Sequence, residues 1–236
     1  MKITSDLHTH TVHSHGTGSV DDNVRAAIEK GLKEIAIADH SVGHLAYGVR
    51  DVEAYLRAID EAKKTYADKI KVKSALELNI LNEDGLLDIP KGYENSFDYL
   101  AFGFHKFAGF TGFANKLRMY LPKSESKKAV DRNTRAYINA IERYKIDFVT
   151  HPGYGLPIDK LRVAEAAVKR GTRLEINNKH PEFTEEELKS CMELGVLFTI
   201  NSDAHSPEKV GILDNALAKA LSAGVPASMI LNAEEN

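Results

Sequence analysis

The sequence predicts an α/β fold in which parallel strands form a closed or nearly closed barrel. Strand-like and helical segments alternate along the 236 residues. Three helical patterns end at a glycine just before a strand-like run, at Gly31, Gly171 and Gly195. This order is typical of parallel βα units. Seven such strands within the length of one domain favour a barrel, and an open doubly wound sheet is the alternative. No G-x-G-x-x-G follows the first strand, so a dinucleotide-binding fold is disfavoured.

The first half of the chain carries four predicted strands and two predicted helices. A short apolar run leads into Asp6 as the first strand, and apolar spacing predicts a helix over residues 19–30. Ser19 and Asp22 resemble a capping pair at its start, and Asp51 is a candidate N-cap for a second helix over 51–66. The remaining strands are expected at 34–38, 72–78 and 97–104, with a polar loop over 82–95.

The second half continues the alternation. Residues 106–121 are irregular and aromatic, and a long helix is expected over about 124–143. Strands are predicted at 148–150, 173–176 and 196–200, separated by helices over 159–170 and from Thr184 to Gly195. Thr184 and Glu187 form a capping box. Ser206 and Pro207 offer an N-cap and a first-turn proline for the last helix.

Composition is that of an ordinary globular protein, and we expect a single domain over residues 1–236. The apolar fraction is 43%, the charged fraction 28% and the formal net charge −3. Cys191 is the sole cysteine, so no internal disulfide forms, which fits a reducing cytoplasm. The first residues lack the apolar core of a signal peptide, and no run is long enough to span a bilayer. We therefore expect a cytoplasmic protein without a membrane or stable nucleic-acid partner. The oligomeric state stays open.

Metal-ligand side chains recur where the predicted strands end. His8 and His10 are spaced i, i+2, so they point to the same side of a strand. Catalytic groups of a β/α barrel stand at the carboxyl ends of its strands, and imidazole is a common metal ligand. Nine donors, too many for one tetrahedral zinc, suit two or three divalent ions. They are His8, His10, His15, His40, Glu77, His105, His151, Asp203 and His205.

These motifs, in this order, resemble the PHP (polymerase and histidinol phosphatase) family, in its single-domain phosphoesterase form. The matching residues are Asp6-x-His8-x-His10, Ala38-Asp39-His40, Glu77, Gly103-Phe104-His105, His151-Pro152-Gly153, residues 174–178 and Ser202-Asp203-Ala204-His205. The resemblance implies a distorted (βα)7 TIM-like barrel that holds three metal ions. It implies one ion on His8, His10, Glu77 and Asp203, a second on Glu77, His105 and His151, and a third on His15, His40 and His205. Either His13 or His15 could fill the loop position, and the spacing favours His15.

The expected activity is hydrolysis of a phosphate ester, in first place a small phosphomonoester, by metal-bound hydroxide. Bound divalent ions lower the pKa of water from 15.7 to about 7. Glu77 can bridge two ions, Asp203 offsets their charge, and His44, close after His40, is a candidate for substrate contact. We count Glu77, Asp203 and His44 as candidate catalytic residues. Zinc is the first candidate for the metal, with manganese or iron as alternatives.

A basic segment follows the fourth predicted strand. Residues 106–135 hold eight basic and two acidic side chains, although the whole chain carries −3. Such a segment beside a metal cluster suits a phosphorylated substrate, and Lys116 and Arg118 are candidate phosphate contacts. A solvated helix surface is the plainer interpretation of part of this charge. Asn177 and Asn178, at a strand end, are candidates to hydrogen-bond metal ligands or substrate.

Three other functions remain open at this stage. The first is a nuclease or proofreading-type phosphodiesterase, disfavoured because the chain shows no extended basic track. The second is a metal-binding module without catalysis, against which the intact donor set argues. The third is an amidohydrolase acting on C–N bonds, whose metal-bridging lysine has no counterpart at a predicted strand end here. The sequence names no particular substrate.

Overall fold

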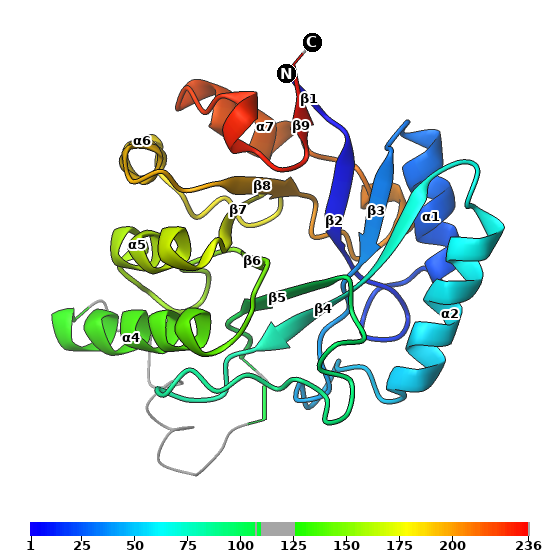
Figure 1. The fold of residues 1–236 in the computed structure, drawn as a ribbon, viewed down its shortest axis with the longest axis horizontal. Helices are drawn as coiled ribbons and strands as arrows, with labels where there is room; N and C mark the ends of the chain where they lie inside the picture. Colours follow the sequence, from blue (N-terminus) through cyan, green and yellow to red (C-terminus); the bar gives the residue numbers. More distant parts are fainter. Residues whose placement is uncertain (107, 110–125, 236) are drawn as a thin grey trace.

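The computed structural model describes residues 1–106, 108–109 and 126–235. In this part of the chain, seven parallel strands form one sheet in their sequence order (Figure 1). The predicted α/β class and its barrel of parallel strands are confirmed. The strands are β2 (Ser5–Thr9), β3 (Glu34–Ile37), β4 (Lys71–Asn79), β5 (Tyr99–Gly103), β6 (Phe148–Val149), β7 (Arg173–Asn177) and β8 (Phe198–Asn201).

The first and last strands of this sheet meet without a regular ladder. Thr9 and Ala204 form an isolated parallel bridge, and the His10 amide donates to the Ala204 carbonyl over 2.8 Å. Further back, the Leu7 amide donates to the Asn201 side-chain oxygen over 3.0 Å. The side-chain oxygen of Asn201 thus accepts the backbone hydrogen bond that a carbonyl of a neighbouring strand would otherwise accept. The barrel is therefore nearly closed, and its last seam is made partly by side chains.

Helices cover the outside of the barrel (Figure 1). Five of the helices in the described residues begin at a side-chain N-cap, which satisfies amides left free at a helix start. These caps are, in order, Ser19, Asp51, Ser126, Asp159 and Thr184. The capping boxes predicted at Ser19 and Thr184 are present. The helices are α1 (Val20–Glu29), α2 (Val52–Thr65), α4 (Lys127–Arg143), α5 (Lys160–Arg170), α6 (Glu185–Glu193) and α7 (Asp214–Ser222).

The chain ends lie together beside the barrel. β1 (Lys2–Ile3) and β9 (Ala233–Glu234) pair antiparallel, and Figure 1 shows the two termini adjacent. Two short 3₁₀ turns, η1 (Pro207–Lys209) and η2 (Ala227–Met229), flank α7. No helix in the described residues is long and apolar enough to cross a bilayer.

A group of apolar side chains, four of them alanines, lies inside the barrel. Leu7, Ala36, Ala38, Ala75, Ala101 and Phe148 form a buried cluster of their own, separate from the larger core between strands and helices. Side chains alternate along a strand, so Glu77 stands on the same face as Ala75, two residues nearer the carboxyl end of β4. The interior therefore changes from apolar to charged along β4.

Several predicted boundaries differ from the structure, and two of these differences have a clear local cause. The last helix does not begin at Ser206, whose side chain makes no capping hydrogen bond. Pro207 starts only the turn η1, Gly211 then takes a left-handed φ of 69°, and α7 begins at Asp214. The fourth predicted strand begins later than expected, at Tyr99, because the Asp98 carboxylate accepts hydrogen bonds from the Ser74 amide and hydroxyl. Most of the irregular segment over 106–121 lies outside the described residues.

Candidate metal centre

The structure brings all nine predicted donors together at the carboxyl ends of the strands. His8 lies on β2, with His10 directly after it, and Glu77 lies on β4. The others follow strands β3, β5, β6 and β8, except His15, which comes from the loop after β2. Beside them lies a cleft of about 230 Å³. Its lining includes His15, His40, Glu77, His105, His151, Asp203 and His205.

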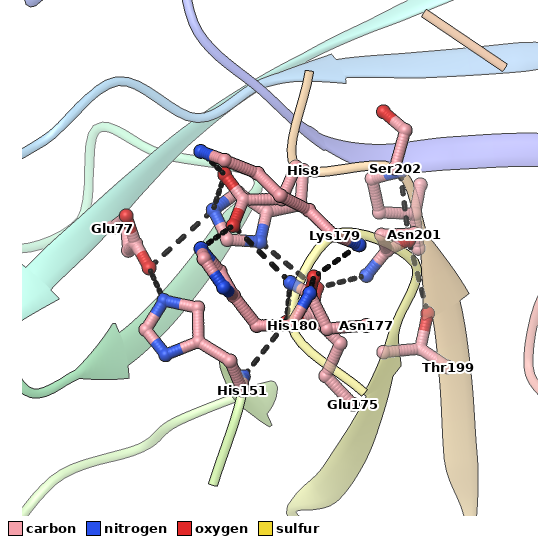
Figure 2. Close-up of polar contacts among 12 residues, drawn as sticks. His8, Glu77, His151, Glu175, Asn177, Lys179, His180, Thr199, Asn201 and Ser202 are labelled. Atoms are coloured by element: carbon pink, nitrogen blue, oxygen red, sulfur yellow. Dashed lines mark hydrogen bonds and ion pairs between the residues drawn. The ribbon is translucent and has the colours of Figure 1, made fainter. Parts of the chain in front are cut away.

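The Glu77 carboxylate is surrounded by histidines, and Figure 2 shows it beside His151. One carboxylate oxygen lies 2.9 Å from His151 Nε2, 3.2 Å from His105 Nε2 and 3.4 Å from His8 Nε2. The other lies 2.8 Å from His40 Nδ1. Yet both oxygens are buried without a hydrogen bond of ordinary geometry among the described residues. Burial would raise the pKa of Glu77, but the surrounding imidazoles hold that pKa well below its usual value.

Two of the imidazoles that surround Glu77 are poor proton carriers. Burial lowers the pKa of His10 to about 3 and that of His40 well below its usual value. Both rings are therefore neutral at pH 7. Neutral imidazole nitrogens and carboxylate oxygens that face one another over 3 to 4 Å present lone pairs to a common space. These lone pairs could coordinate divalent cations, because carboxylate and imidazole are usual ligands of such ions.

Asp203 forms the second half of the cluster. Its Oδ1 lies 3.3 Å from His10 Nε2 and 3.4 Å from His205 Nδ1. Asp203 has a φ of 54° and His151 a φ of 28°, conformations that side chains other than glycine rarely adopt. Strained backbone of this kind gathers at functional sites, where the surroundings enforce it. Here it turns both side chains toward the cluster.

Three groups of described residues could each hold a metal ion, with candidate ligand atoms within 4.8 Å of one another. They are His8, His10 and Asp203; His40, Glu77 and His105; and His10, His40 and His205. The first resembles the first predicted ligand set. The other two groups differ from the predicted sets. His40 joins Glu77 and His105 in place of His151, and His10 joins His40 and His205 in place of His15. These side chains fit a cluster of divalent ions.

The loop after β2 separates the two candidate histidines. The His15 ring lies 4.2 Å from the His205 ring and 4.9 Å from the His40 ring, between ring centres. His13 instead contacts Tyr55, with ring centres 5.3 Å apart. Asp39 holds this loop by accepting hydrogen bonds from Thr11 and Ser14. His15 therefore reaches the cluster, while His13 points to the α2 side.

Buried polar residues orient the donors, and the sequence analysis assigned no role to them. Glu175 Oε1 accepts from His8 Nδ1 over 2.8 Å, which leaves His8 Nε2 to face the cluster. In the same way, Asn79 Oδ1 accepts from His105 Nδ1 over 2.8 Å, and Asp88 fixes the Asn79 amide. The missed signal was period-2 spacing: Glu175 stands two residues before Asn177, between the apolar Leu174 and Ile176.

Of the predicted substrate contacts that the structure describes, His44 lines the cleft, whereas Asn177 and Asn178 bond to other parts of the protein. His44 lines the cleft, and its ring stacks on His40 with centres 5.1 Å apart. Asn177 donates to Glu175 over 2.7 Å and to Asp203 over 3.3 Å. Asn178 accepts from the amides of Asn215 and Ala216 at the start of α7. Lys116 and Arg118 lie outside the described residues.

Three side chains in the cleft wall were not predicted. Lys179 Nζ lies 3.0 Å from His205 Nδ1 and 3.7 Å from Asp203 Oδ1 (Figure 2). Tyr154 stacks on His180 with ring centres 3.7 Å apart, and both line the cleft. No pattern in the sequence singles them out, because they reach the site only through the loops after β6 and β7.

Comparisons with known proteins agree with the family resemblance of the sequence. Residues 6–186 match the profile of a family described as PHP domain. A protein of Thermoanaerobacter sp. (strain X514) named "probable phosphatase" is 30% identical, over 99% of this chain and 92% of its own length. A similarly named protein of Shewanella loihica is 30% identical over 98% of this chain and 90% of its own. The fold resembles the Lactococcus lactis histidinol phosphate phosphatase, solved with zinc, L-histidinol and phosphate. The TM-score is 0.67 at 18% identity, over 94% of each chain.

Proposed function

This chain belongs to the PHP domain family and is a phosphoesterase, and we propose that it hydrolyses a small phosphomonoester with two or three divalent ions. Zinc is the first candidate, since the Lactococcus lactis phosphatase was solved with it. The nine donors named in the sequence analysis are the proposed ligands. One observation supports this most strongly: the buried Glu77 carboxylate faces imidazole nitrogens without an ordinary hydrogen bond.

The ions supply Lewis acidity, which makes water a nucleophile near neutral pH and stabilises charge on the phosphoryl group. The protein orients the ligands and sets the charge of the site. Glu175 fixes the tautomer of His8, and Asn79 fixes the ring of His105. Glu77 and Asp203 offset only part of the charge of two or three divalent ions. The centre therefore favours an anionic substrate such as a phosphate dianion.

His44 has a defined task in this proposal. Burial lowers its pKa to about 4, so the ring is neutral at pH 7 and does not act as a proton donor to the leaving group. Its Nδ1 accepts from the Tyr47 amide over 3.0 Å, so the proton of the neutral ring is on Nε2. That N–H can donate a hydrogen bond to a phosphoryl oxygen in the cleft. We infer that His44 orients substrate.

The test joins metal analysis with substrate screening on the undialysed, full-length protein. We expect about two to three transition-metal ions per chain and turnover of phosphate monoesters above that of a diester or a single-stranded oligonucleotide. A metal content well below one ion per chain would refute the proposed centre. Faster cleavage of the oligonucleotide would favour the nuclease alternative, and full metal without turnover of any ester would favour a non-catalytic module.

A matched pair of variants tests the ligand assignment within the same loop. His15→Ala should lose about one ion per chain with much of the activity, because the His15 ring lies among the donors. His13→Ala should retain both, because its ring contacts Tyr55 outside the cluster. The reverse pattern would assign the ligand to His13.

A further inference from the structure

A second pocket lies directly beside the metal cleft. It has a volume of about 440 Å³, and Lys179, Asp203 and His205 line both spaces. Its other lining residues come from the end of β7, from the segment between β8 and α7, and from the first turn of α7: Asn178, Ser202, Ser206, Lys209, Ile212 and Asn215. The pocket therefore begins at the proposed ligands and extends away from them.

The chemistry of this lining is basic and polar. Among the described residues it holds two lysines, and its one acid is Asp203. Both oxygens of Asp203 already face other groups, since Oδ1 lies 3.3 Å from His10 Nε2 and Oδ2 lies 3.3 Å from Asn177 Nδ2. Amide and hydroxyl groups make up most of the rest. The charged and hydrogen-bonding side chains of this pocket suit an anionic group that accepts hydrogen bonds.

The two lysines differ in their present contacts. Lys179 stands at the border of the two spaces, where its Nζ lies 3.0 Å from His205 and 3.7 Å from Asp203. Lys209 lies in the exposed turn η1, and no carboxylate of the described residues is within 4.0 Å of its ammonium. An uncompensated ammonium in a pocket wall next to a phosphate-binding centre has an anion as its natural partner.

We propose that this pocket binds the leaving group of the substrate, and that Lys179 and Lys209 select a leaving group that carries a second anionic group. This inference rests on the proposed function, because the first phosphate must lie at the metal cleft. A carboxylate and a second phosphate share the required chemistry. Lys179, at the border, contacts the substrate near the reacting phosphate, while Lys209 contacts its distal anion.

The experiment measures binding to the metal-loaded, full-length protein by calorimetry, with phosphonates that cannot be hydrolysed. Propylphosphonate carries one anionic group, 3-phosphonopropionate adds a carboxylate, and 1,3-propanediphosphonate adds a second phosphonate. Wild-type protein should bind one or both of the doubly anionic compounds more tightly than propylphosphonate. Which of them binds more tightly identifies the second group as carboxylate or phosphate.

Lysine variants then locate that preference. In Lys209→Ala, the preference for the doubly anionic compounds over propylphosphonate should fall by about threefold to tenfold. This is the range expected for losing one partly exposed charge pair. Lys179→Ala should weaken all three phosphonates, because it removes charge beside the reacting phosphate as well. Lys189→Ala, on the exposed surface of α6 and outside the pocket lining, is the matched control and should leave all affinities unchanged.

The outcomes separate this inference from the proposed function. A preference that stays within about twofold of wild type in Lys209→Ala and in Lys179→Ala would overturn the pocket assignment, while binding of propylphosphonate would leave the phosphoesterase intact. A wild-type preference for propylphosphonate over both doubly anionic compounds would overturn it as well. Failure of the loaded protein to bind any phosphonate would overturn both proposals.

Discussion

Glu77 on β4 and Glu175 on β7 are the same residue type, both fully buried in the barrel, but their surroundings differ. Each oxygen of Glu175 accepts two hydrogen bonds. Oε1 accepts from His8 and Asn201, and Oε2 from the His151 amide and Asn177, all over 2.7 to 2.8 Å. Glu77 is instead surrounded by the nitrogens of histidines and lacks ordinary hydrogen bonds.

The difference shows how one barrel uses two buried charges for different tasks. A buried carboxylate is costly unless it is paired or hydrogen-bonded. Glu175 is stabilised by fixed donors, so it can hold His8 and the backbone of His151 in place. Glu77 lacks such donors, and cations are the partners that would stabilise it. We therefore treat Glu77 as a ligand and Glu175 as a positioning residue.

Removing the charge of Glu77 should give the largest effect. Glu77→Gln keeps the shape of the side chain but cannot bridge two cations. We expect kcat/KM on a phosphate monoester to fall by about a thousandfold or more, together with loss of at least one metal ion. Kinetics and elemental analysis on one preparation measure both. Glu165→Gln, on the exposed surface of α5, is the control, and normal turnover with full metal in Glu77→Gln would contradict the assignment.

The same change at Glu175 should act through metal affinity. Glu175→Gln replaces one carboxylate oxygen with an amide donor. That donor then faces two existing donors, His8 and Asn201 if Oε1 is replaced, or the His151 amide and Asn177 if Oε2 is replaced. Loss of such a supporting group typically lowers metal affinity by about 10- to 100-fold. Competition with a chelator measures this affinity, and excess metal should restore part of the activity. An effect as large as that of Glu77→Gln, with no rescue, would make Glu175 a ligand.

A methyl group at Gly103 should give a smaller effect on the Glu77 side. A Cβ there would overlap Thr150 Oγ1 and lie 2.8 Å from His151 Cε1, so Gly103→Ala must displace both side chains. We expect kcat/KM to fall by about tenfold and stability by about 1 to 3 kcal/mol. Ala101→Gly, on the same strand face, should lower stability while retaining activity. If both variants lose activity in proportion to stability, Gly103 serves packing alone.

The smallest effect is the titration of one imidazole. Burial alone would lower the pKa of His8, but Glu175, then Glu77 and Asp203, raise it well above its usual value in the metal-free protein. His8 should therefore keep its proton above pH 6.5, while His10, with a pKa of about 3, stays neutral. The stabilising contribution of the protonated His8 ring is fully present below pH 6.5 and disappears as pH rises through the folded-state pKa of His8.

Imidazole nitrogen NMR of the metal-free protein measures this titration. Glu175→Gln should lower the pKa of His8, since it removes the carboxylate with the largest influence on that ring. His13, which faces Asp51 rather than Glu175, is the internal reference and should titrate as in wild type. An unchanged His8 titration would show that Glu175 does not control its protonation.

Much of the fold and of the donor set could be predicted because both depend on local patterns. Apolar runs, capping residues and glycines at helix ends are read within ten to twenty residues, so the strand order and most boundaries were predicted correctly. The parallel order then places every strand's carboxyl end on one side of the barrel. For this reason histidines and acids at strand ends could be grouped before any contact was known.

Tertiary structure alone decided what depends on segments far apart in the sequence. Asp39 accepts from Thr11 and Ser14, and the loop so held brings His15 to the cluster while His13 packs on Tyr55. Glu175 contacts His8 across the barrel, 167 residues away. Lys179 reaches His205 only because β7 and β8 are neighbours. A sequence pattern records which side chains are available, whereas their partners follow from how the closed sheet places distant residues beside one another.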